Sequence, residues 1–133
     1  IIVPSEGSLG VGAGAPPVLV GDDLVLFFHE READGQYTVK VALLDHDTGR
    51  PSSILPEAIM RPQLSWERSG DVDDVVFVQG AVAQADGTIY LTYGAADRCG
   101  SGSGCCRGRC GPTAAGSGSS RTSGAGASRC WRA

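Results

Sequence analysis

Short apolar runs separated by polar turns dominate the first hundred residues and predict a body rich in β-strands. Residues 24–28 are apolar without interruption, as in a strand that is covered on both faces. Gly-Asp-Asp at residues 21–23 and Ala-Asp-Gly at residues 85–87 are turn signals, and the second predicts a β-hairpin. The runs that we expect to be strands are residues 18–20, 24–29, 37–44, 75–83 and 88–93.

Residues 50–74 predict a long irregular connection. Three prolines interrupt this stretch, and one helical turn is expected near residues 57–60. No amphipathic helix of useful length is predicted, so the body is expected to be all-β. Because strands leave sheet edges that must be covered or paired, the pattern predicts a piece of a larger closed assembly such as a β-propeller.

The composition changes abruptly after Arg98. All fifteen Asp and Glu residues lie at or before Asp97, and all five cysteines lie at or after Cys99. Residues 1–98 hold six Lys or Arg against fifteen Asp or Glu, a formal charge of −9, whereas residues 99–133 hold five Arg and no acid. We therefore divide the chain into a β body, residues 1–98, and a Gly/Ser/Arg/Cys tail, residues 99–133.

Several interpretations of the tail stay open. Its near lack of large apolar residues predicts disorder. Five scattered Arg make a weak nucleic-acid or membrane arm, and an odd number of cysteines gives a disulfide-rich module little support. A zinc site would draw on cysteines whose spacing is not a pair of C-x-x-C units: Cys99, Cys105, Cys106 and Cys110. A further hypothesis is a change of reading frame at Arg98, because GC-rich DNA read out of frame encodes such residues.

The charge and hydropathy of the body exclude several classes of partner. An acidic body argues against nucleic acid, since phosphate binding needs a basic face. No apolar stretch approaches the ~20 residues that span a bilayer, and no signal peptide is recognisable, so no membrane partner is predicted. The body lacks cysteine, which fits a reducing cytoplasm. His29 and His46 have no cysteine near them, and no metal site is expected.

Eight short strings occur in order along the body: GAGAPP at 12–17, FFH at 27–29, VALLD at 41–45, PE at 56–57, WER at 66–68, VVF at 75–77, GAV at 80–82 and YGAAD at 93–97. In order and spacing, residues 8–98 resemble glycoside hydrolase family 130, the β-mannoside phosphorylases and related mannosidases. The resemblance implies about the last two blades of a five-bladed β-propeller, followed here by the tail that we expect to be disordered.

The resemblance also implies a sugar site at the mouth of the propeller channel. Such enzymes cleave a β-mannosidic bond of an oligosaccharide with inversion, by phosphorolysis or hydrolysis. In the phosphorylases inorganic phosphate is the co-substrate, no other cofactor is implied, and an aspartate protonates the departing sugar. That aspartate lies in the first half of the family's sequence and has no counterpart here, so the chain is expected to be inactive alone.

His29 and Asp97 are the leading candidates for substrate binding. By the resemblance, His29 lies near the sugar and the phosphate, where an imidazole can donate to an oxygen. Without the resemblance, it is more simply a strand-end histidine bonded to a loop carbonyl. The resemblance places Asp97 in the sugar subsite, where a carboxylate accepts hydroxyl protons. Its alternative role is that of a turn or cap residue.

Gly12 and Gly14 precede two prolines and form a segment whose backbone can approach a ligand closely. No helix follows, so this is no dinucleotide fingerprint. By the resemblance, the phosphorylases usually carry Lys or Arg two residues before the first glycine of this string, and Gly10 stands there instead. Since phosphate needs cationic partners, its absence favours hydrolysis.

Glu67 and Arg68 follow Trp66 in the irregular connection, where they either line the channel or pair on a solvated loop. Asp73 and Asp74 are adjacent, but on one strand their side chains would point to opposite faces, so a shared acid/base role is not expected.

Two functions of different classes follow from the sequence. The first is a fragment of a carbohydrate-active enzyme that acts on β-mannosides. The second is a non-enzymatic β module that binds carbohydrate or another protein chain through its exposed edges.

Overall fold

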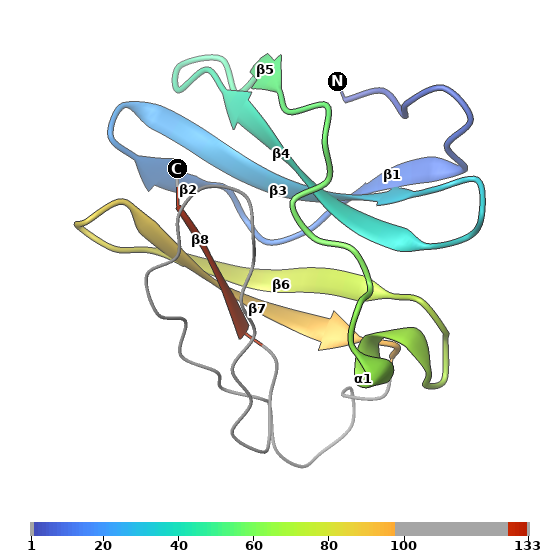
Figure 1. Cartoon of the computed structure of the whole chain (residues 1–133). Helices are drawn as coiled ribbons and strands as arrows, with labels where there is room; N and C mark the ends of the chain where they lie inside the picture. The colour runs from blue at the N-terminus through green and yellow to red at the C-terminus, as the bar shows by residue number, and fades with distance from the viewer. Residues whose placement is uncertain (1, 98–127, 133) are drawn as a thin grey trace.

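Two antiparallel sheets pack face to face in the computed structural model, which describes residues 2–97 and 128–132 (Figure 1). The first sheet has the order β1-β3-β4-β5, and β2 also pairs with β3. Its strands are β1 (Gly10–Ala13), β2 (Val18–Val20), β3 (Asp23–Arg31), β4 (Tyr37–Leu44) and β5 (Pro51–Ile54). The second sheet has the order β6-β7-β8, with β6 (Val76–Ala83), β7 (Thr88–Ala95) and β8 (Ser128–Arg132). One short helix, α1 (Ser65–Arg68), lies in the connection between them.

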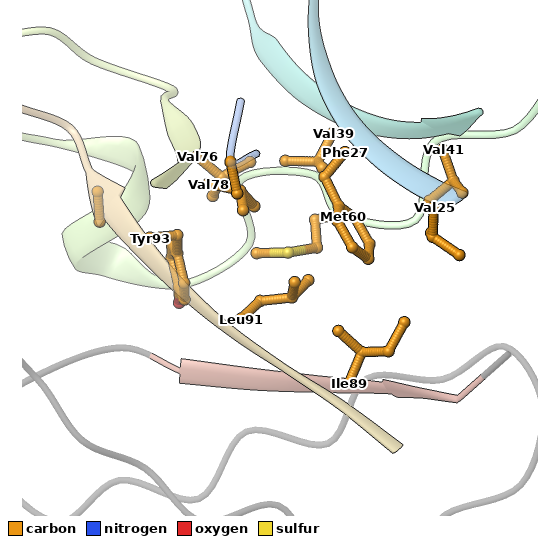
Figure 2. Close-up of a cluster of buried hydrophobic side chains, with 12 residues drawn as sticks. Val25, Phe27, Val39, Val41, Met60, Val76, Val78, Ile89, Leu91 and Tyr93 are labelled. Atoms are coloured by element: carbon orange, nitrogen blue, oxygen red, sulfur yellow. The ribbon is translucent and has the colours of Figure 1, made fainter. Parts of the chain in front are cut away.

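The main hydrophobic core lies between the two sheets. Figure 2 shows side chains of β3 and β4 meeting those of β6 and β7, with Met60 among them. Because successive residues of a strand point to opposite faces, every second residue of β3 and β4 contributes to this core. Its buried members are Ala15, Val25, Phe27, Val39, Val41, Met60, Val76, Val78, Ile89, Leu91, Tyr93 and Ala95.

The opposite face of the first sheet carries a smaller apolar cluster and a buried ion pair. Phe28, Ala42 and Leu44 form the cluster. Beside it, Lys40 Nζ pairs with the carboxylate of Glu30, and their side chains are 8% and 1% exposed. Strand β3 is therefore buried on both faces, as its uninterrupted apolar run predicts.

The N-terminal segment is held by this ion pair. Ser5 donates its backbone N–H and its hydroxyl to Glu30, and Lys40 Nζ donates to Ser5 Oγ at 2.9 Å. Burial alone would raise the pKa of Glu30, but the hydrogen bonds from Lys40 and Ser5 outweigh it and lower that pKa to about 2. The ion pair thus fixes residues near the N-terminus to the outer face of the sheet.

The all-β class is confirmed, and each of the five predicted strands is found. Strands β2 and β4 have the predicted bounds, and the β6–β7 hairpin forms. The short strands β1 and β5 were not predicted. The helical turn expected at residues 57–60 was wrong: helix α1 begins at Ser65, where the carboxylate of Glu67 accepts backbone N–H groups.

The described sheets do not close on themselves, so the partial β-propeller stays a prediction. The expectation of disorder in residues 99–127, like that of a frame change, lies outside the described residues. Residues 128–132 differ from that expectation, since they pair with β7 as β8. Backbone hydrogen bonds along an open strand edge place little demand on side-chain type, which explains how a tail segment can occupy this edge. No helix in the described part of the chain is long and apolar enough to cross a membrane.

We predict that Lys40→Met destabilises the chain by roughly 3 kcal/mol, because it leaves the Glu30 carboxylate buried without its cation. Arg61→Met is the matched control. Arg61 also pairs with a glutamate, Glu32 at 3.6 Å, but is 52% exposed, so a change within about 0.5 kcal/mol is expected. Urea unfolding followed by circular dichroism measures both. Equal losses in the two variants would contradict a dominant role for the buried pair.

Candidate functional site

Most of the candidate residues gather at one end of the molecule. Residue Arg31 at the end of β3 pairs with Tyr37 at the start of β4, and Tyr37 forms a bridge to Val75. Strand β6 begins next to Val75, and its first residue pairs with Ala95 at the end of β7. The ends of β3 and β7 and the start of β6 therefore lie together, beside α1 (Figure 1).

His29 is a fully buried, neutral imidazole. It is 2% exposed, and its ring stacks on Phe77 with the ring centres 3.7 Å apart. The backbone N–H of Val78 donates to Nε2 at 2.7 Å, so Nε2 carries no proton and the neutral ring holds its proton on Nδ1. Burial lowers the pKa of His29 from 6.5 to about 4, and the Ala13 backbone carbonyl opposes that shift in part. Among the residues described, Nδ1 has no partner in hydrogen-bond geometry.

Gly14 and Gly12 shape the space around this imidazole in opposite ways. A Cβ on Gly14 would lie 2.6 Å from the Phe27 carbonyl oxygen and 2.9 Å from His29 Cε1, so the backbone contacts the ring edge only because residue 14 is glycine. Gly12 pairs with His29 across β1 and β3, and nothing lies within 4 Å of where its Cβ would be. Gly14 permits close packing against His29, and Gly12 leaves a space open beside it.

A cavity of about 300 Å³ occupies this open space. Its lining combines one buried imidazole, one guanidinium and two other aromatic rings with glycine-rich backbone. The lining residues are Leu9, Gly10, Val11, Gly12, His29, Arg31, Tyr37 and Phe77. They include no carboxylate, although the described body is acidic. The cavity therefore offers hydrogen-bond donors and apolar surface to a small polar ligand.

Glu67 is buried and holds the irregular connection to the second sheet. Its Oε2 accepts the backbone N–H groups of Gln63 and Leu64 at 2.8 and 2.9 Å, and its Oε1 accepts the Tyr93 hydroxyl at 2.6 Å. Its backbone carbonyl accepts the N–H of Val75, just before β6 begins. Of the two roles considered for it, pairing on a solvated loop is excluded, since the residue is 0% exposed.

Arg68 and Asp97 are exposed and lie outside the cavity lining. The Arg68 carbonyl accepts the N–H of Asp74, and the loop that follows it donates two N–H groups to the carbonyl of Ala96. Asp97 has a φ of 52°, a left-handed conformation that aspartate tolerates in turns. The structure thus joins His29 with the two glycines in one place and leaves Asp97 and Arg68 in the neighbouring loops.

Five members of the cavity were not identified from the sequence: Leu9, Val11, Arg31, Tyr37 and Phe77. The period-2 alternation of β3 was the available signal, since it puts Arg31 on the same face as His29. The contributions of Tyr37 and Phe77 depend on strand pairing, which the sequence does not specify. Within residues 2–97, no three His, Cys, Asp or Glu side chains gather as a metal site would require.

The comparison with protein families gives one match that covers most of the chain. The profile of the glycoside hydrolase 130 family, described as beta-1,4-mannooligosaccharide phosphorylase, matches residues 1–101. The match ends close to the change in composition after Arg98, so it covers the body and little of the tail.

Characterised relatives carry related names. A 1,2-beta-oligomannan phosphorylase of Thermoanaerobacter sp. is 37% identical over 93 residues, and a beta-1,2-mannobiose phosphorylase of Listeria innocua is 32% identical over 100 residues. These alignments cover 68% and 72% of this chain. They cover 30% and 27% of the relatives, so the chain spans less than a third of their length.

Solved structures show the same likeness. The beta-1,2-mannobiose phosphorylase of Listeria innocua in complex with beta-1,2-mannobiose superposes with a TM-score of 0.60 at 30% identity, over 65% of this chain and 25% of that one. A putative glycoside hydrolase of Parabacteroides distasonis gives a TM-score of 0.58 at 26% identity, over 66% and 28%.

The depressed pKa of His29 predicts how stability depends on pH. The unfolded chain protonates this residue below pH 6.5, whereas the folded chain protonates it only near pH 4. The unfolded state therefore binds more protons in this window, and the free energy of unfolding falls by roughly 2 kcal/mol between pH 7 and pH 5. Urea unfolding across this range measures the slope. His29→Gln should remove it, and His46→Gln, at a side chain 63% exposed, should keep it.

Glu67 is also expected to stabilise the folded chain through the groups that its carboxylate accepts. Glu67→Leu leaves two backbone N–H groups and the Tyr93 hydroxyl without this acceptor, and we expect a loss of about 3 kcal/mol. Glu67→Gln keeps one oxygen that accepts the two backbone N–H groups, and its amide N–H can donate to the Tyr93 hydroxyl oxygen. Its loss of stability is therefore expected to be roughly 1 kcal/mol. Chemical unfolding separates the two. A Leu variant as stable as the Gln variant would contradict the structural role of the carboxylate.

Proposed function

The chain belongs to glycoside hydrolase family 130, and on that premise we propose that it forms the C-terminal, sugar-binding part of an enzyme that cleaves β-mannosidic bonds. The observation that carries the proposal is the family match over residues 1–101. The cavity at His29 supports it, because its lining combines an imidazole, a guanidinium and aromatic rings, which suits a small polar ligand such as a sugar. The two stacked sheets are then successive blades of a propeller that other parts of the enzyme complete.

The proposed roles follow from the position of each side chain. His29 donates through Nδ1–H and is neutral near pH 7, so it acts as a hydrogen-bond donor and not as a cation. Asp97, exposed in the neighbouring turn, accepts hydroxyl groups of the mannoside. Gly12 gives the ligand room, and Gly14 lets the backbone pack against the imidazole. Glu67 shapes the loops that carry Arg68 and Asp97 at the edge of the site.

The chemical step needs a proton donor that these residues do not provide. In an inverting cleavage, phosphate or water attacks the anomeric carbon while an acid protonates the departing sugar oxygen. No residue of this sequence matches the aspartate that the family uses for that purpose, so we propose that this acid comes from a part of the enzyme outside this sequence. The absence of cysteine from residues 1–98 supports a cytoplasmic location.

We predict that the purified chain alone does not turn over β-1,2-mannobiose, with or without phosphate. A chimera supplies the missing acid: residues 8–97 replace the matching segment of the Listeria innocua beta-1,2-mannobiose phosphorylase, to which the chain is similar. We expect the chimera to cleave β-1,2-mannobiose. Chromatography of the products separates the two nucleophiles, because phosphorolysis releases mannose 1-phosphate together with the departing mannose, whereas hydrolysis releases only free mannose.

His29→Gln in the chimera should lower kcat/KM by about a hundredfold, the usual loss for one preorganised donor. His46→Gln is the control and should leave kcat/KM unchanged, since His46 is exposed in a loop. Turnover by the isolated chain would contradict the proposal that the catalytic acid comes from a part of the enzyme outside this sequence. A folded chimera that neither binds nor cleaves the mannoside would contradict the proposed function itself.

A further inference from the structure

Backbone strain is concentrated at one place in the described part of the chain. Its three non-glycine residues with a left-handed φ are Asp74 at 57°, Ala96 at 49° and Asp97 at 52°. They lie in two segments that touch, because the N–H of Ala96 donates to the carbonyl of Val75 at 3.0 Å. Aspartate tolerates this conformation, whereas alanine rarely adopts it. Such a residue persists only where its surroundings enforce the conformation, and residues of this kind cluster at functional sites.

The loop between α1 and β6, residues 69–75, holds Ala96 on both sides. The Ala96 carbonyl accepts the N–H groups of Asp71 and Val72 at 2.9 and 3.2 Å, and its N–H donates to the last residue of the loop. Both backbone polar groups of Ala96 are therefore bonded to one loop, and the residue is 0% exposed. Asp97, which follows it, is exposed. The loop thus fixes the residue next to Asp97 and leaves Asp97 itself at the surface.

Gly70 allows this loop to approach so closely. A Cβ at position 70 would lie 2.1 Å from the Ala96 carbonyl oxygen and 2.6 Å from the Ala96 Cβ. The φ of Gly70 is not left-handed, so this glycine supplies space and not an unusual conformation. Its N–H donates to the Asp73 carboxylate at 3.0 Å, which closes the loop on itself. Any other residue at position 70 must push the loop and the turn at Ala96 apart.

The start of the loop is also tied to β7. Helix α1 lies beside the end of this strand (Figure 1), and its Glu67 accepts the Tyr93 hydroxyl. The Glu67 backbone carbonyl accepts the N–H of Val75, so both ends of the loop are held together. The turn that carries Asp97 is therefore supported from Tyr93 and from Ala96. A carboxylate on such a rigid support binds a ligand without first being ordered, which favours affinity.

We propose that residues 69–75, through the close contact of Gly70 with Ala96, hold Asp97 in the conformation in which its carboxylate accepts mannoside hydroxyls. This inference rests on the proposed function, and it makes Gly70 a positioning residue that acts through Asp97. A loop that served stability alone would lower the stability of the chain when altered and leave the affinity for the sugar unchanged.

The chimera described above tests the proposal with β-1,2-mannobiose. Gly70→Ala should raise the KM for this sugar about tenfold and keep kcat within about threefold, because a weakened sugar contact away from the reacting bond changes binding more than chemistry. Asp97→Asn keeps a residue that tolerates the left-handed turn but removes the charge, and it should raise KM by a similar factor. The double variant should be no worse than Asp97→Asn alone, since Gly70 acts through Asp97.

Gly87→Ala is the matched control for a general loss of stability. Gly87 has a φ of 81° and lies in the turn between β6 and β7, at the opposite end of β7 from Asp97. Nothing lies within 4 Å of where its Cβ would be, so alanine there strains the backbone without touching the 69–75 loop. The KM for β-1,2-mannobiose should be unchanged in this variant.

Asp73→Ala is a milder change in the same loop, and it serves where Gly70→Ala does not fold. It removes the acceptor of the Gly70 N–H from an exposed side chain, so the loop loosens without a new clash. We expect the KM for β-1,2-mannobiose to rise about threefold. An unchanged KM in the folded loop variants, in a chimera that Asp97→Asn impairs, would overturn the positioning role. A double variant with fully additive losses would overturn it as well.

The full 133-residue chain gives a readout that needs no sugar. The three-bond coupling between the amide proton and Hα reports φ, and NMR spectra give it for Ala96 and Asp97. Gly70→Ala should change both couplings, and Gly87→Ala should change neither. Unchanged couplings in Gly70→Ala would overturn the proposal, because the turn would then keep its conformation without the close contact.

These measurements separate the inference from the proposed function. Asp97→Asn without effect on KM would overturn the inference while the mannoside function stands. A folded chimera that neither binds nor cleaves the mannoside would overturn the proposed function, and with it the sugar-binding role of Asp97. Changed couplings in the Gly70→Ala chain would in that case still support the support of the turn by Gly70.

Discussion

The burial of β3 on both faces is the constraint on which the rest of the structure depends. One face of this strand gives Val25 and Phe27 to the core between the sheets, and the other gives Phe28 to the second cluster. A strand enclosed in this way must place its polar residues where each can be satisfied, since an unpaired polar group in the interior is costly. Because successive side chains of a strand point to alternate faces, the last three residues of β3 do not share one face. Glu30 turns to the outer face and needs Lys40, whereas His29 and Arg31 turn toward the second sheet.

The site is a consequence of where this core ends. His29 is the first polar residue on the inner face after Phe27, and it is held by Phe77 and the N–H of Val78 from the second sheet. Two residues further along the strand, Arg31 has left the core and is exposed. The cavity lies across this boundary, with the buried imidazole of His29 on one side and the exposed guanidinium of Arg31 on the other. Glycine in place of larger residues on β1 keeps the boundary open.

The parts of the fold that were predicted from sequence are those that depend on local patterns. Apolar runs predict strands β2 and β4, and apolar runs on either side of turn residues predict the β6–β7 hairpin. Strands β1 and β5 have four residues each, and their conformation depends on the neighbouring strand more than on their own composition. Helix α1 likewise depends on a distant partner, since Glu67 must meet Tyr93 from β7. Sequence spacing alone gives no such pairing.

The same distinction applies to the site. His29 and the glycines at positions 12 and 14 were identified from their order along the chain, and the β1–β3 register brings them together. That register also sets Arg31 opposite Gly10, and both residues belong to the cavity lining. Arg31 gives the cavity a positive charge, and no carboxylate belongs to its lining. The body has a formal charge of −9, but the placement of donors around the cavity matters more for a ligand than this net charge. Close donors in a partly buried cavity act on a ligand far more strongly than screened charges at the surface.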